Sequence, residues 1–178
     1  MFALALAFLL APAGAAAQGD ARAAEVRVKA AFLYKFCDFV EWPPEAFAEP
    51  GGAFTIGVVG ADALADELAQ VVARRSVQGR PVAVRKLKLG APLAGLHMLF
   101  VGGRDGSRLP EVLAAAKGQP TLTVTEAEGD GDPGSAINFV LVADKVRFDV
   151  ALPPAEAGGL RISARLLAVA RKVVAGDS

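Results

Sequence analysis

The chain has 178 residues, of which 53% are hydrophobic and 21% charged, and its 19 basic residues balance 19 acidic ones. This length suits one domain with a substantial core, and the composition excludes an intrinsically disordered chain. No cluster of Lys and Arg stands out, which argues against a protein that binds nucleic acid by neutralising phosphates.

The first 17 residues are uncharged and mostly apolar, and they end in Ala15-Ala16-Ala17. This pattern is typical of a secretory signal peptide with a small-residue cleavage site. Its apolar run of about ten residues is shorter than the roughly 20 that a membrane-spanning helix needs. We therefore expect residues 1–17 to be a cleaved signal peptide and residues 18–178 to form an exported domain that is not embedded in the membrane.

Hydrophobic spacing predicts alternating helices and strands along the mature chain. Helices are expected over Glu25–Trp42, from an N-cap at Asp62 to about Ala73, and through Pro110–Lys117. Short apolar runs predict strands at Phe54–Gly60, Pro81–Leu87, His97–Val101 and Thr121–Thr125. Strands that alternate with helices in this way indicate a mostly parallel sheet.

The last quarter of the chain departs from this alternation. Two apolar runs, Ile137–Val142 and Val146–Val150, flank the short polar break Ala143-Asp144-Lys145 and predict an antiparallel hairpin. A helix capped by Ser163 is expected to run to about Val174. The predicted fold is thus a compact single-domain α/β sandwich, with a mostly parallel sheet flanked by helices and a C-terminal antiparallel hairpin and helix.

No constellation of catalytic or zinc-binding residues emerges. Cys37 is the single cysteine, so an intrachain disulfide is impossible, and its position on the apolar side of the first predicted helix favours a buried residue. His97 is the single histidine, and nothing in the sequence places it beside Cys37 as a nucleophile and base would require. One Cys and one His do not make a closed zinc site.

Two loops need weighing as ligand sites. Glu126, Glu128, Asp130 and Asp132 alternate as calcium ligands do, but they lack the spacing of an EF-hand, so a solvated acidic turn is favoured. The Gly-rich turn at residues 102–107 follows a strand and opens a helix, where α/β sheets bind anions, but it matches no phosphate-binding motif. We expect no enzyme, no metal and no cofactor.

Several blocks together resemble the YfiR-like (HmsC-like) periplasmic proteins, from about Val26 to Val174. Their order and spacing carry the resemblance, and the blocks are Val28–Pro43, Phe54–Gly60, His97–Val101, Thr121–Thr125, Ile137–Phe139, Val146–Val150 and Gly159–Leu167. Relatives often have a cysteine where Leu96 stands, and this chain has no second cysteine. Redox control through intrachain disulfides is therefore not carried over from the family.

The resemblance implies a non-enzymatic repressor that binds the periplasmic sensor domain of a membrane diguanylate cyclase and lowers cyclic di-GMP output, which controls biofilm and exopolysaccharide production. It also implies sequestration by an outer-membrane lipoprotein, a possible homodimer and, in some relatives, other receptors such as histidine kinases. The alternative is a periplasmic protein that binds a small ligand near residues 102–107 and reports it to a receptor.

The C-terminal unit, residues 136–174, is the candidate partner-binding surface. Because aromatic residues and Arg anchor many interfaces, we select Phe148, Glu156, Leu160, Arg161 and Arg165 as candidate contacts. Phe148 lies within a predicted strand, where a core position is the favoured alternative.

Overall fold

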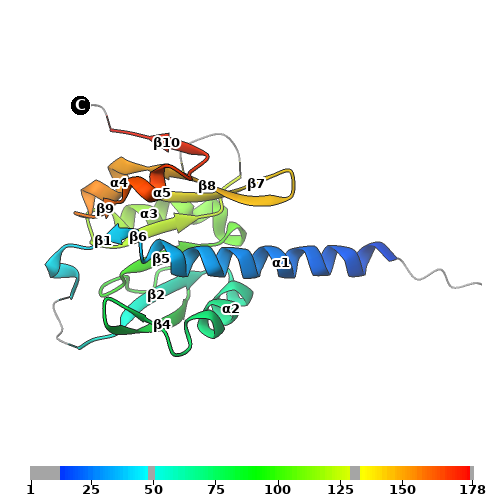
Figure 1. Ribbon diagram of the computed structural model, residues 1–178, viewed down its shortest axis with the longest axis horizontal. Coiled ribbons are helices and arrows are strands. Elements are labelled where there is room, and N and C mark those ends of the chain that lie inside the picture. The colour runs from blue at the N-terminus through cyan, green and yellow to red at the C-terminus, as the bar shows by residue number, and fades with distance from the viewer. Residues whose placement is uncertain (1–12, 48–50, 129–132, 177–178) are drawn as a thin grey trace, which may run out of the picture.

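The computed structural model describes residues 13–47, 51–128 and 133–176 and confirms the α/β class (Figure 1). Its helices are α1 (Ala13–Phe36), α2 (Asp62–Val72), α3 (Leu109–Ala116), α4 (Leu152–Ala157) and α5 (Ala164–Leu167), with 3₁₀ helices η1 (Pro44–Phe47) and η2 (Gly103–Arg108). Its strands are β1 (Val40–Glu41), β2 (Phe54–Val59), β3 (Ser76–Val77), β4 (Arg80–Leu87), β5 (Met98–Val101), β6 (Leu122–Thr125), β7 (Ile137–Val142), β8 (Lys145–Ala151), β9 (Arg161–Ile162) and β10 (Lys172–Val174).

Eight of these strands form one sheet in the order β10-β8-β7-β6-β5-β2-β4-β3. The pairs β2–β4, β2–β5, β5–β6, β6–β7 and β10–β8 are parallel, whereas β7–β8 and β3–β4 are antiparallel. The predicted parallel sheet with an antiparallel hairpin is thus confirmed. The two short strands β1 and β9 pair separately and join the end of α1 to the C-terminal unit.

Strand β5 is apolar at every position because both of its faces are buried. Met98 and Phe100 pack in the core cluster that includes α1 and α2, while Leu99 and Val101 pack in the second cluster, which includes α3. Successive side chains of a strand point to opposite faces, so a strand covered by helices on both sides has no polar face. Figure 1 shows α1 and α2 across one face of the sheet and α3 on the other.

The first helix differs from its predicted bounds at both ends. It runs over Ala13–Phe36 rather than Glu25–Trp42, and it therefore includes part of the predicted signal peptide, of which residues 1–12 lie outside the described chain. Beyond Phe36 the chain turns and forms β1, because Trp42 packs at right angles to Phe54 and its indole Nε1–H donates to the His97 carbonyl at 2.9 Å. These tertiary contacts prevail over the helical spacing of Val40.

The predicted C-terminal helix is largely wrong in extent. Ser163 does act as its N-cap, since its hydroxyl accepts a hydrogen bond from the Leu166 N–H at 3.4 Å, but α5 ends at Leu167. The chain then forms β10, which pairs with β8. Arg171 explains the change, because its N–H donates to the Phe148 carbonyl and its guanidinium pairs with Asp149, both of which belong to β8.

Two local predictions change in detail. Ala61, not Asp62, is the N-cap of α2, and Asp62 lies in the first turn, where a carboxylate still interacts favourably with the helix dipole. The hairpin turn has two residues rather than three, because Val142 pairs with Lys145. Ala143 and Asp144 both have positive φ angles, 48° and 58°, as a two-residue hairpin turn with the twist of the strands requires.

Candidate partner-binding surface and the polar network at the sheet edge

The structure divides the five predicted contact residues into two groups. Glu156 in α4, Arg161 in β9 and Arg165 in α5 are exposed, and Figure 1 shows their elements gathered at one end of the molecule, beside β10. Phe148 and Leu160 are only 3% and 1% exposed. Both side chains belong to the hydrophobic core, whereas the other three residues are exposed.

The burial of Phe148 has a clear physical cause. Its ring packs edge-on against Phe36 and Phe32 of α1, with centroid distances of 5.1 and 5.6 Å. Aromatic pairs in this geometry stabilise a core beyond their buried area. Phe148 therefore joins β8 to α1.

The exposed residues of this unit are predominantly basic. Between Lys145 and Gly176 there are six basic and two acidic residues, a net charge of +4 in a chain whose total is zero. Asp149 is already paired with Arg171. Within the described residues, Arg161, Arg165 and Lys172 have no ion-pair partner, so their charges are free to attract an acidic surface.

Two exposed apolar side chains, which were not among the predicted contacts, lie close to Arg165 and Lys172 in the chain. Val169 and Val173 are 66% and 41% exposed. In a helix that continued to Val174, both would lie on the same apolar face as Leu166, but α5 ends at Leu167. We define the C-terminal surface as Glu156, Arg161, Arg165, Val169, Lys172 and Val173.

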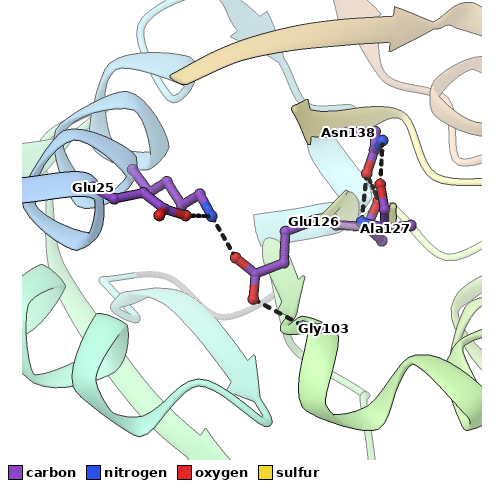
Figure 2. A network of polar contacts seen from close by, with 7 residues as sticks. Glu25, Gly103, Glu126, Ala127 and Asn138 are labelled. Carbon is purple, nitrogen blue, oxygen red and sulfur yellow. Dashed lines mark hydrogen bonds and ion pairs between the residues drawn. The ribbon is translucent and has the colours of Figure 1, made fainter. Parts of the chain in front are cut away.

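A second candidate site is a polar network at the carboxyl ends of β5 and β6 (Figure 2). The ammonium of Lys29, a buried residue of α1, pairs with Glu25 and lies 2.6 Å from Glu126 Oε2. The other oxygen of Glu126 accepts the Gly103 N–H at 2.8 Å. Burial lowers the pKa of Lys29, but hydrogen bonds to Glu126 and Glu25 outweigh that effect and leave the pKa raised.

The same loop is fastened to the sheet by Asn138 of β7. Its side-chain amide donates to the Ala127 carbonyl at 3.2 Å, and its oxygen accepts the Ala127 N–H at 2.9 Å and the Thr125 hydroxyl at 2.7 Å. Figure 2 shows Asn138 facing Ala127 while Glu126 points toward Gly103 and α1. The residues that follow β6 are therefore fixed by side-chain bonds.

This geometry bears on both loops that were weighed as ligand sites. Glu126 already occupies the Gly103 N–H, which an external anion at residues 102–107 would need, so a plain connection is favoured. Glu126 is an ion-pair partner of Lys29, whereas Asp130 and Asp132 lie outside the described residues. Among the residues that are described, no group of three or more His, Cys, Asp or Glu side chains is placed to hold a metal ion.

Cys37 is buried, as its apolar position predicted, and its thiol donates to the Leu33 carbonyl. Burial raises the pKa of Cys37 to about 12, so the reactive thiolate is scarce at neutral pH. The position of this cysteine on an apolar helix face was sufficient to predict its burial.

The His97 ring lies between Phe54 and Phe47, with centroid distances of 4.7 and 4.9 Å. Its Nδ1 accepts the Thr55 N–H at 3.1 Å. Its Nε2 is buried and has no hydrogen-bond partner of normal geometry in the described part of the chain, although the backbone of Ala46 is near enough to raise the pKa of the ring. Burial lowers the pKa of His97, and nearby Arg80 lowers it further. This imidazole is a neutral structural group, bonded to a strand rather than to Cys37.

In the part of the chain that the structure describes, no helix has the length and apolar character needed to cross a membrane. A search of the curated proteins gives no match to this chain. A family model does match, over residues 26–171, which include the C-terminal surface up to Val169 and all of the polar network except Glu25. The chain belongs to the YfiR/HmsC-like family.

Proposed function

We propose that this protein is a non-enzymatic periplasmic regulator that binds the sensor domain of an inner-membrane diguanylate cyclase. By holding that receptor in its inactive state, it lowers cyclic di-GMP output and so restrains biofilm and exopolysaccharide production. The observation that carries the proposal is the family match over residues 26–171. That family is a regulatory one, and membership of it is consistent with a role in the control of cyclic di-GMP signalling.

The C-terminal surface supports this proposal as the site of contact. Arg161 and Arg165 are exposed cations without an ion-pair partner among the described residues, and Glu156 lies close by in the chain. The Gly159 N–H donates to the Glu156 carbonyl, and this turn leads directly into β9. A rigid turn that presents Arg side chains costs little conformational entropy when a partner binds.

Repression requires a difference between two affinities. A protein that binds both receptor states equally shifts nothing, and moving a receptor from 1% to 99% inactive takes about 5.5 kcal/mol of preference for the inactive state. The family likeness also suggests how repression is relieved, namely by an outer-membrane lipoprotein that sequesters the regulator.

Calorimetry with the purified chain from Gln18 onward and the periplasmic domain of the receptor tests the proposal. We expect saturable binding, and Arg161→Glu should weaken it about tenfold or more, because a charge reversal replaces attraction with repulsion. Arg85→Glu is the matched control, since Arg85 is also an exposed arginine, in β4, near the opposite edge of the sheet.

Two results would contradict the proposal. Absence of binding by a folded protein would remove the receptor assignment. Equal affinities for Arg161→Glu and Arg85→Glu would remove this surface. The small-ligand alternative is separated by thermal shift: a ligand at 100 times its Kd should stabilise the fold by about 2.7 kcal/mol, whereas a protein-binding module should not respond to anionic metabolites.

A further inference from the structure

Strand β10 leaves one edge of the eight-stranded sheet open. It is the outermost strand in the sheet order and pairs with β8 alone among the described strands. Figure 1 shows it at the outer rim of the molecule. A strand with one neighbour leaves alternate backbone N–H and C=O groups unpaired, and such an edge is a template for another chain.

The register shows which backbone groups are free. The Ala151 N–H of β8 donates to Ala136, on the side of β7, so the neighbouring residue Val150 turns its backbone groups toward β10. Val173 is the partner of Val150 in this parallel pair. In a parallel ladder one residue of each such pair bonds across and the other points away, so the N–H and C=O of Val173 face the open edge.

This edge is held firmly in place. The Arg171 N–H donates to the Phe148 carbonyl at 2.9 Å, and its Nε lies 2.7 Å from Asp149 Oδ1. Phe148 is in turn anchored in the aromatic core beneath. An incoming segment would therefore meet an edge that is already ordered.

Side chains around the edge define what it would accept. Val169 and Val173 offer exposed apolar contact. Arg165 lies four residues before Val169, and both are exposed, whereas Leu166 of α5 is buried. Lys172 adds a further cation, which has no ion-pair partner among the described residues. The C-terminal surface holds three cations and one carboxylate, a net charge of +2, so it is complementary to acidic side chains.

We propose that an extended, acidic segment of the protein partner adds a strand beside β10. Its backbone bonds to Val173, its apolar side chains cover Val169 and Val173, and its carboxylates face Arg161, Arg165 and Lys172. A peptide is favoured over an anionic lipid or nucleic acid because a peptide backbone supplies both the donor and the acceptor that an open strand edge needs. The inference rests on the proposed function only for the identity of the partner.

Hydrogen exchange followed residue by residue tests the inference on the unaltered protein. The Val173 amide should exchange rapidly in the free chain and about tenfold more slowly when the receptor domain is bound. A synthetic peptide of alternating Val and Glu should slow the same amide, whereas its Val and Lys counterpart should not. Unchanged exchange at Val173 with both the receptor and the acidic peptide would overturn the inference.

Variants give an independent measure. Val173→Pro removes the outward N–H and should weaken the receptor complex about tenfold, because one hydrogen bond is lost. Val169→Ser should weaken it about fivefold through lost apolar contact. Val28→Ser is the matched control, since Val28 is a similarly exposed valine on α1, outside this surface.

The outcomes separate the two proposals. Receptor binding that is insensitive to Val173→Pro and Val169→Ser, with an unprotected Val173 amide, would leave the proposed function standing and refute strand addition. No receptor binding, with protection of the Val173 amide by the acidic peptide, would refute the proposed function and leave strand addition standing. Binding to phosphatidylglycerol vesicles without any effect of the acidic peptide would identify a lipid surface and overturn the inference.

Discussion

Replacing Lys29 with Met should destabilise the fold, because it leaves the carboxylate of Glu126 without its cation. Lys29 is 7% exposed and its ammonium lies 2.6 Å from Glu126 Oε2, in a side chain that is 26% exposed. Breaking a fully buried ion pair costs about 3–5 kcal/mol. Since Glu126 reaches solvent and keeps the Gly103 N–H, we expect a loss of about 2 kcal/mol in the free energy of unfolding.

A double-mutant cycle in urea isolates the interaction. Glu126→Gln retains an oxygen for Gly103 and should cost about 1 kcal/mol, and the double variant should cost about 1 kcal/mol less than the sum of the single ones. Lys86→Met is the matched control: Lys86 also lies 2.6 Å from a carboxylate, that of Asp66, but the two side chains are 47% and 63% exposed. Its unfolding midpoint should not change measurably, because solvent screens the pair.

The pH dependence provides a second check. The pKa of Lys29 is raised above its ordinary value of 10.5, so its contribution to stability is complete below that pH and is lost as the pH rises through the folded-state pKa. Lys29→Met should lack this alkaline loss. The reasoning would be refuted if Lys29→Met matched Lys86→Met in stability, or if the cycle were additive.

Three further predictions concern the core and the hairpin. Cys37 should resist thiol reagents at pH 8 in the folded protein and react on unfolding, because burial raises its pKa to about 12; rapid labelling of the native protein would contradict its burial. Stability should fall below about pH 6.5, by at most ~1.4 kcal/mol per pH unit from His97, because its folded pKa is lowered and the unfolded chain takes up the proton first; His97→Phe should reduce this slope. Ala143→Asn with Asp144→Gly should raise the urea midpoint, since Ala and Asp are strained at positive φ by about 1 kcal/mol per residue, and an unchanged midpoint would show that the turn is relaxed.

The strands were the most predictable part of this fold. β2, β5 and β6 lie within two residues of their expected bounds, because a strand covered on both faces requires a short run of apolar residues that flanking glycines and turns interrupt. The hairpin was visible for a related reason, since two apolar runs enclose a short polar break. These signals are local, and each depends on a few adjacent side chains.

The candidate site was less accessible to sequence reasoning. Arg161 and Arg165 were selected for their residue type and are exposed, but Phe148 and Leu160 are core residues whose burial depends on α1 and the rest of the C-terminal unit. Lys29 and Glu126 are 97 positions apart, and no local pattern links them. The charge asymmetry of the C-terminal unit was hidden by the neutral total.

Apolar patterning along the chain was enough to determine the α/β class, the parallel sheet and the hairpin, and the order of the sequence blocks was enough to indicate the family. Tertiary structure decided how the C-terminal segment is used. The same apolar spacing that suits a helix after Ser163 also suits α5 followed by β10, and local propensity does not choose between them. Pairing with β8 and the Arg171–Asp149 bridge make that choice, because they offer contacts that an isolated helix lacks, and only then do Val169 and Val173 reach the surface.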